Sequence, residues 1–335
     1  MEIVLLANNY VLPFQDFNKE HGLDFVELNK LFAIKSLAEH GLGFLINICE
    51  IKDNNKCKIV KRIVYDTGGT NLTYLHNLDL RACDISDIDC VILSHWHYDH
   101  TGGLYKVLER IQEKKVLIIC HDYAQHERFF KIAKGIRNSD LEGKTRKELL
   151  PLISNSKIEN QEPINLDKIK DLNGTVIFSK ERYELFDKKG LKVSASGEIP
   201  RIHDEEKFDD FFSLQENIMK VDNILDDKCL IFEYPDRMVL LIGCCHSGIM
   251  NTLDYLKKKI NKPISHIIGG FHLANASKKR IENTIEYLKN FQGQDQTLCL
   301  FPVHCSGENF VQEVNKANIP NIKAYNASVG TTFNL

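Results

Sequence analysis

The feature that most constrains this sequence is a cluster of potential metal ligands at residues 94–103, SHWHYDHTGG. Within six residues it contains three histidines and one aspartate: His95, His97, Asp99 and His100. Imidazole and carboxylate groups are the ligands that proteins use for zinc and for non-haem iron or manganese. In an extended chain His95 and His97 point the same way, so both can bind one ion. Asp99 and His100 follow after the chain turns and can reach a second ion.

The cluster lies on a loop between a predicted strand and a predicted helix. Residues 90–93 (CVIL) form the apolar run that is typical of a buried strand. Two glycines close the cluster, and residues 104–108 begin a helical pattern. Because loops that follow strands carry functional groups in α/β folds, this placement favours a metal site over a histidine-rich surface loop.

The C-terminal third of the chain adds three more histidines at comparable positions. From residue 228 onward, apolar strand patterns alternate with helical patterns, which predicts a sheet covered by helices. Three consecutive predicted strands each end shortly before a histidine, namely His246, His272 and His304. Since strand ends are where such folds gather ligands, we expect these histidines near the first cluster.

The motif HxHxDH, present here at residues 95–100, resembles the metallo-β-lactamase superfamily, as does the upstream strand that ends at Asp66. Other stretches are similar to one branch of it, the archaeal dihydropterin–ribofuranosylaminobenzene phosphate synthases of methanopterin biosynthesis and their bacterial relatives of unassigned activity: residues 196–201, 226–230, 243–248, 269–273 and 302–307. The similarity extends from about residue 41 to the C-terminus. Trp96 departs from the branch, which usually has glycine there, and is expected to place a large ring beside the metal site.

The resemblance implies an α/β metallo-β-lactamase fold, an αββα sandwich of two mixed β-sheets flanked by helices. We expect a single domain over residues 1–335. Within it, the stretch at about residues 123–214 changes character, because it is polar and basic in its first half and then acidic. We interpret this stretch as a lid-like insertion carried on the core.

The resemblance also guides the choice of metal ligands. In the superfamily the last ligand is a histidine that ends a late strand, which fits His304, and an aspartate after a strand-glycine turn bridges the ions. Here Cys244, Cys245 and His246 follow the glycine instead. We assign His246 as a ligand and treat both cysteines as thiols near the site, at least one of them buried among apolar residues. The predicted metal ligands are therefore His95, His97, Asp99, His100, His246 and His304. Two divalent ions are expected, zinc first, with iron or manganese as alternatives.

Further residues are candidates for catalysis and substrate binding. Asp99 and His272 are predicted to be catalytic, the latter as an acid/base or substrate contact, with a hydrogen-bonded core histidine as the alternative. Arg201 can fork onto a phosphate, unless it is only a surface arginine in a turn. Ser247 and Ser306 each precede a predicted helix, whose start favours anions. Asp66 is expected to orient a ligand histidine by accepting its other N–H.

Composition restricts the partners. The net charge of −3 gives no electrostatic footprint for nucleic acid. No apolar run is long enough to span a membrane, and no signal peptide precedes the first strand, so a cytoplasmic location is expected. The ten cysteines are scattered, and several lie in strand-like runs (Cys90, Cys120 and Cys299), which favours buried free thiols. The oligomeric state stays open.

These features lead to one leading hypothesis and two alternatives. The leading hypothesis is a metal-dependent enzyme with a dinuclear site that acts on a phosphorylated or diphosphate small molecule. Its narrowest form, implied by the resemblance, is a dihydropterin-type synthase that forms a C–N bond while diphosphate leaves. The first alternative is a metallo-hydrolase of phosphodiester, lactone or thioester bonds. The second is a metal-binding sensor or an inactive relative.

Overall fold

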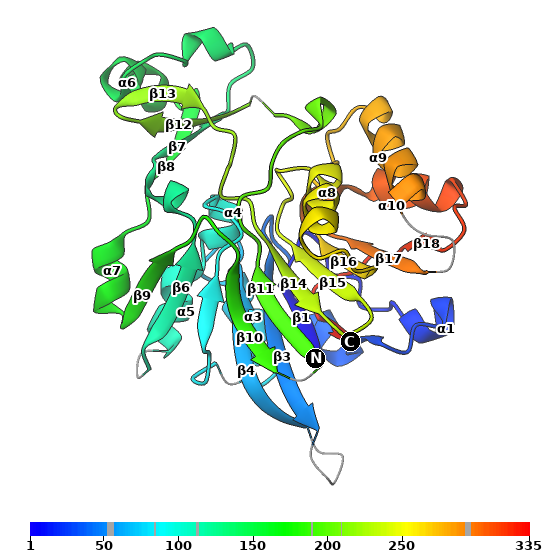
Figure 1. Ribbon diagram of the computed structural model, residues 1–335. Coiled ribbons are helices and arrows are strands. Elements are labelled where there is room, and N and C mark those ends of the chain that lie inside the picture. Colours follow the sequence, from blue (N-terminus) through cyan, green and yellow to red (C-terminus); the bar gives the residue numbers. More distant parts are fainter. Residues whose placement is uncertain (52–56, 84, 112–113, 189, 209, 292–295) are drawn as a thin grey trace.

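The computed structural model describes residues 1–335 except 52–56, 84, 112–113, 189, 209 and 292–295, and it contains two large packed sheets (Figure 1). The first sheet has eight strands, in the order β2 (Val26–Leu28), β19 (Thr331–Asn334), β1 (Glu2–Ala7), β3 (Gly43–Ile51), β4 (Cys57–Tyr65), β5 (Cys90–Ile92), β6 (Val116–Cys120) and β9 (Gly174–Phe178). The second has seven strands, in the order β10 (Tyr183–Lys188), β11 (Leu191–Ala195), β14 (Cys229–Glu233), β15 (Met238–Ile242), β16 (Ile264–Gly269), β17 (Leu298–Pro302) and β18 (Ile322–Ala324). Both sheets are mixed, because each joins a parallel set to antiparallel neighbours.

Helices cover the outer faces of both sheets. The first sheet is covered by α3 (Thr73–Leu80), α5 (Leu104–Ile111) and α7 (Leu166–Asp171). The second is covered by α8 (Ile249–Lys259), α9 (Lys278–Phe291) and α10 (Glu308–Lys316), which lie to the right in Figure 1. The predicted αββα sandwich is therefore confirmed. Further α-helices are α1 (Phe17–His21), α2 (Lys30–Lys35), α4 (Tyr98–Thr101) and α6 (Arg146–Ser154).

Strand β15 shows why these residues form a sandwich. Its five residues are all buried, and successive side chains of a strand point to opposite faces. Val239 and Leu241 join the core between the two sheets. Leu240 and Ile242 join the core beneath the helices. A strand that is apolar at every position is thus needed, since both of its faces are covered.

A third, four-stranded sheet stands beside the sandwich, at the upper left of Figure 1. Its strands are β13 (Ile218–Val221), β12 (Phe211–Gln215), β7 (Arg128–Lys131) and β8 (Ile158–Gln161). Together with α6 it has its own small core, which includes Phe129, Leu149 and Phe212. We call these elements the insertion sheet.

The insertion differs from the continuous stretch expected at about residues 123–214. Its strands come from two segments, residues 128–161 and 211–221. The chain between them returns to the sandwich, where β9 pairs with β6 and β11 pairs with β14. The reason is local composition, because Val193 and Ala195 of β11 are apolar enough to join the central core.

Three smaller observations bear on the sequence predictions. No helix in the described part of the chain is long and apolar enough to cross a membrane. Cys90, Cys120 and Cys299 are buried free thiols, as expected. Cys49 departs from that expectation, because it is disulfide-bonded.

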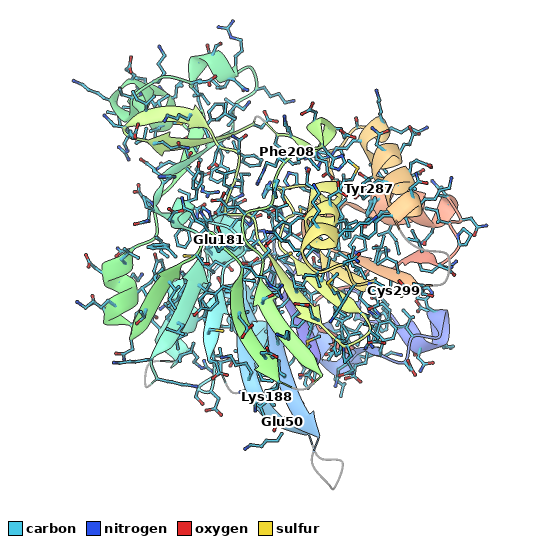
Figure 2. All side chains as sticks on the ribbon, in the orientation of Figure 1. Glu50, Glu181, Lys188, Phe208, Tyr287 and Cys299 are labelled. Carbon is cyan, nitrogen blue, oxygen red and sulfur yellow. The ribbon has the colours of Figure 1, made fainter. Side chains whose placement is uncertain are left out.

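The strand directions bring several loops to one edge of the sandwich. Strands β4 and β5 are parallel, and β1 runs the same way because both β1 and β4 are antiparallel to β3. Strands β15, β16 and β17 are parallel to one another. Figure 2 shows Phe208 at the end of the molecule near the insertion sheet, and Glu50 and Lys188, which form a 2.8 Å ion pair, at the opposite end.

Candidate metal centre

A first group of metal-ligating side chains joins the loop after β5 to the loop after β15. Nε2 of His95 lies 3.0 Å from Nδ1 of His97. One ligand atom each of His95, Cys244 and His246 lie within 4.8 Å of one another. The ring centroids of His97 and His246 are 4.9 Å apart. Three of the predicted metal ligands, His95, His97 and His246, are thus close together, and the thiol of Cys244 joins them.

A second group lies directly beside the first. Ligand atoms of Asp99, His100, Cys244 and His304 lie within 4.8 Å of one another. Nε2 of His304 is 3.2 Å from Oδ2 of Asp99, and Nε2 of His100 is 3.0 Å from Sγ of Cys244. Burial opposes the charged form of His100, but Asp66 and Asp99 raise its pKa to about 9. A proton and a divalent ion therefore compete for this ring.

Cys244 belongs to both groups, a role that the sequence did not assign to it. The sequence suggested only a thiol near the site for Cys244 and Cys245. In the structure Cys245 turns away, with φ of +57°, and packs in the core beneath the helices, where its Sγ is 3.6 Å from Oγ1 of Thr252. Cys244 thus occupies the position that lies between the two groups.

Buried ring nitrogens without partners show that the centre suits metal ions. His97 Nε2, His304 Nε2 and both ring nitrogens of His246 have no hydrogen-bond partner among the described residues. Leaving a buried polar atom unpaired costs about 1–3 kcal/mol. Burial lowers the pKa of His95 and His246 well below the usual value, and burial together with the Arg128 charge lowers the pKa of His97 to about 3. These neutral rings offer lone pairs, so the donors fit divalent ions.

The carboxylate of Asp66 orients ligands in both groups. Its Oδ2 accepts from Nδ1 of His100 at 2.6 Å and from Oγ of Ser94 at 2.6 Å, and its Oδ1 accepts from N of Ser94 at 2.7 Å. Because the Ser94 hydroxyl donates to Asp66, it can only accept from Nδ1 of His95, which is 2.9 Å away. Both imidazoles therefore present Nε2 to the centre, and the hydrogen bond from His100 to Asp66 is the contact that the predicted orienting role requires.

A buried ion pair links the loop at residues 94–103, which we call the metal-binding loop, to the insertion sheet. Oδ2 of Asp226 accepts from N of Trp96 at 2.7 Å and from Nη2 of Arg128, on β7, at 2.7 Å. The Trp96 ring was expected beside the metal site. It points away from the metal-ligating side chains instead, and its Nε1–H donates to the Glu162 carbonyl at 2.9 Å. It packs in the core beneath α3 and α5. The metal-binding loop is thus fixed to β7 through two side chains.

A cavity of about 1020 Å³ opens above both donor groups. Its floor includes His97, Asp99, Cys244, His246 and His304. Its rim carries aromatic rings of the insertion sheet and the segment before it, Phe130, Phe208 and Phe211, and the cations Lys207, Lys279 and Arg280. The Phe211 ring stacks on His97, with centroids 5.0 Å apart, and the Arg280 guanidinium lies 4.4 Å from the Phe208 centroid. The cavity therefore combines metal ligands, aromatic surface and positive charge.

The predicted substrate-binding residues divide into two kinds. His272 lines the cavity, and its Nδ1 has no partner among the described residues. Arg201 instead donates to the carbonyls of Ile199 and Ile224. The Ser247 hydroxyl donates to Asp227 at 2.6 Å, and the Ser306 hydroxyl donates to the Val303 carbonyl at 2.6 Å. Arg201, Ser247 and Ser306 thus form hydrogen bonds within the protein and do not line the cavity.

Other residues of the cavity wall were not singled out from the sequence. These include Asn9, His40 and Cys305. Asn9 follows β1, so the strand-end argument that found His246 could have found it as well. Cys305 has its Sγ within 4.8 Å of donor atoms of Cys244 and His272, and its place directly after His304 was the available signal.

Comparisons with known proteins agree with this geometry. Residues 61–170, which contain Asp66 and the histidine cluster, match the family model described as the metallo-beta-lactamase superfamily. An uncharacterized protein of Methanocaldococcus jannaschii is 29% identical over 286 residues, which is 85% of this chain and 90% of that protein.

Two further matches are informative. The 7,8-dihydropterin-6-methyl-4-(beta-D-ribofuranosyl)-aminobenzene-5'-phosphate synthase of the same organism is 29% identical over 299 residues, which cover 86% of this chain and 88% of the synthase. A solved structure described as a metal-dependent hydrolase of the beta-lactamase superfamily aligns over 100% of this chain and 99% of its own, with a TM-score of 0.67 and 18% identity. This structural match supports the fold.

Proposed function

We propose that the chain is a metal-dependent enzyme with a dinuclear centre that acts on a phosphorylated or diphosphate small molecule, and the match of residues 61–170 to the metallo-beta-lactamase superfamily model supports this proposal. The observation that carries the proposal is the cavity, in which two donor groups that share Cys244 face a rim with Lys279 and Arg280. Neither of these two cations forms an ion pair within the described part of the chain. They are therefore available to an anionic substrate.

The donors would be divided between two ions. The first ion would be held by His95, His97, His246 and Cys244. The second would be held by Asp99, His100, His304 and Cys244. Zinc is the expected metal, because the set mixes thiolate, imidazole and carboxylate, and iron or manganese are the alternatives. Two such ions supply Lewis acidity toward phosphoryl oxygens.

The surrounding side chains have separate tasks in this proposal. Phe211 covers one face of His97 and keeps water from the first group. Lys279 and Arg280 hold the phosphate groups at the rim. Asp99 anchors the second group, with its Oδ2 near His304. Nδ1 of His272, buried and without a partner among the described residues, can hold or release a proton beside the bound substrate.

The synthase of Methanocaldococcus jannaschii supports a transferase form of the reaction. The product in its name carries a 5'-phosphate and a dihydropterin. In the narrow form of the proposal this chain joins an arylamine to a pterin while diphosphate leaves. The alternative is a hydrolase of phosphodiester, lactone or thioester bonds, in which water attacks the phosphorus or the carbonyl carbon and the alcohol or thiol leaves.

A matched pair of adjacent lysines tests the proposal. Lys279→Ala removes a cation of the cavity rim, whereas Lys278→Ala removes its neighbour, which pairs with Glu282 at 3.7 Å and does not line the cavity. Zinc-loaded protein is assayed with aryl phosphodiesters and alkyl diphosphates, with and without an arylamine. We expect about two equivalents of zinc in all proteins and a KM increase of roughly tenfold only in Lys279→Ala, as for loss of one charged hydrogen bond.

The outcomes separate the alternatives. Turnover that requires the arylamine supports the transferase, and turnover without it supports the hydrolase. Zinc-loaded protein that turns over neither substrate class contradicts the proposed function. Equal KM values for the two lysine variants would show that the substrate phosphate binds elsewhere.

A further inference from the structure

The dipeptide that follows β1 contacts the last predicted metal ligand. Oδ1 of Asn8 accepts from the backbone N of His304 at 2.9 Å, and Nδ2 of Asn8 donates to the Ala327 carbonyl at 3.1 Å. His304 has a φ of +53°, which is an uncommon conformation for a residue with a side chain. The buried Asn8 amide therefore holds the backbone of His304 in place.

Asn9 lies between two imidazoles. Its Oδ1 is 2.8 Å from Nδ1 of His304, and its Nδ2 is 3.3 Å from Nδ1 of His40. The two rings are themselves close, with centroids 4.8 Å apart. Nε2 of His40 in turn lies 3.4 Å from Oδ2 of Asp99. One amide side chain thus joins a residue of the second donor group to a residue of the cavity rim.

The chemistry of the amide fixes which atoms carry hydrogen. Nε2 of His304 faces Asp99 and has no hydrogen-bond partner among the described residues. When this nitrogen offers its lone pair to an ion, Nδ1 must carry the ring hydrogen and donate to Oδ1 of Asn9. The NH₂ end of Asn9 then points at Nδ1 of His40, which accepts. His40 must consequently carry its hydrogen on Nε2.

His40 is held in this position by its neighbours, although 55% of its side chain is exposed. Glu39 donates its backbone N–H to the Asn8 carbonyl at 3.0 Å, and Leu42 donates to the Asp99 carbonyl at 3.0 Å. A Cβ on Gly41 would lie 2.5 Å from N of Gly69, in the loop after β4, and 2.9 Å from the carbonyl O of Asp99, so the segment passes both loops too closely for any other residue. An incidental surface contact would not be fixed on both sides in this way.

We propose that Asn9 is a positioning residue that couples the tautomer of His304 to that of His40. Through it, metal binding at the second group makes Nε2 of His40 a hydrogen-bond donor toward Asp99 and the phosphorylated substrate. The proposal rests on the proposed function, because it requires His304 to be a metal ligand. Asn9 and His40 lie in the N-terminal segment, outside the histidine motifs.

The tautomers can be observed directly. Protein labelled with ¹⁵N-histidine is loaded with zinc, and long-range ¹H–¹⁵N correlations identify the protonated nitrogen of each ring. His40 is assigned by its loss in His40→Gln. We expect hydrogen on Nε2 of His40. In Asn9→Asp, the carboxylate accepts from both imidazoles, so the hydrogen of His40 should move to Nδ1. His76, whose Nε2 is 3.0 Å from the Lys35 carbonyl, should keep its Nε2 hydrogen in both proteins.

Metal content and kinetics complete the test. Asn9→Ala should lower the zinc affinity of the second group by about 10-fold or more, as for other outer partners of metal ligands. His40→Gln should keep its zinc and raise KM by roughly 10-fold for the phosphorylated probe, the effect of one lost hydrogen bond to a charged group. An unchanged His40 tautomer in zinc-loaded Asn9→Asp would overturn the coupling while the metal centre stands. Protein that binds no zinc by plasma mass spectrometry would overturn both proposals.

Discussion

The floor and the rim of the cavity are built in opposite ways. On the floor Cys244 is buried, and directly behind the floor Asp66 and Ser94 are buried too, where Asp66 accepts three hydrogen bonds. On the rim, Lys207 and Lys279 are exposed and come from segments that lie outside the large sheets. A change on the floor therefore disturbs several groups at once, whereas a change on the rim removes one contact.

This difference separates chemistry from selectivity. The floor determines which ions and protons are held, because each of its donors is oriented by another buried group. The rim determines which molecule can approach, because its phenylalanines and cations are the first surfaces that a ligand meets. If the comparison is correct, floor variants should lose metal and stability, and rim variants should retain both while substrate affinity falls.

The largest expected effect is that of Cys244→Ala. Since Cys244 belongs to both donor groups, its loss should weaken binding of both ions by more than the roughly 10- to 100-fold that loss of an outer partner costs. Cys245→Ala is the matched control. The Cys245 side chain packs in the core, so this variant should keep both ions. Metal content after dialysis against a weak chelator measures the effect. Retention of two equivalents in Cys244→Ala would show that the thiol does not bridge.

Asp66→Ala should have the next largest effect. The substitution leaves Ser94 N–H, the Ser94 hydroxyl and His100 Nδ1 without their acceptor. Breaking a buried charged pair in this way costs about 3–5 kcal/mol, and metal affinity should fall as well. The exposed pair of Asp79 and Arg110 is the control, since Asp79→Ala should cost under about 1 kcal/mol. Urea unfolding of all three proteins tests the difference, and equal midpoints would contradict it.

Two neighbouring phenylalanines allow the effect of a rim substitution to be distinguished from that of a substitution in the core of the insertion sheet. Phe211 lines the cavity and stacks on His97, whereas Phe212, the next residue of β12, points into the small core of the insertion sheet. Phe211→Ala should raise KM about 2- to 10-fold with stability preserved, as expected for one aromatic contact. Phe212→Ala should cost about 3–5 kcal/mol in stability. Steady-state kinetics and thermal unfolding distinguish them, and a Phe211→Ala variant that loses zinc would assign Phe211 to the floor.

Much of the floor could be predicted from the sequence because apolar runs mark strands and histidines follow them. His246 and His304 were found by that argument, and both lie in the donor groups. The sequence did not predict that Cys244 belongs to both donor groups, because two adjacent cysteines in an apolar context look equivalent. Only the left-handed turn at Cys245 decides which thiol faces the site.

Residues brought in by long-range pairing were harder to predict. Asn9 follows β1 of the first sheet and His304 follows β17 of the second, so their contact depends on how the two sheets pack, which no local pattern encodes. The prediction for Arg201 shows the converse problem. Its guanidinium could serve an anion, but the fold supplies two backbone carbonyls instead, and a sequence does not show how far such carbonyls lie from the side chain.

The last expected effect concerns only the pH dependence of stability, and it arises at a lysine that lies behind the floor. The backbone N of Lys228 donates to the Ser94 carbonyl at 3.0 Å, and its buried Nζ donates to the Ser196 carbonyl at 2.9 Å. Burial lowers the pKa of this lysine from 10.5 to about 8. Between these two values the unfolded chain binds more protons than the folded one at this site, so this lysine makes stability rise with pH in that window.

Lys228→Met should remove that contribution. Therefore the free energy of unfolding of the wild type, minus that of Lys228→Met, should increase from pH 8 to pH 10.5 and stay constant from pH 6 to pH 7, where the lysine is protonated in both states. Urea titrations at a series of pH values measure this difference and cancel the titration of tyrosines and thiols common to both proteins. A flat difference across the whole range would mean that Lys228 keeps its ordinary pKa in the fold. Burial behind the loop at residues 94–103 would then not disfavour the charged form of the ammonium group.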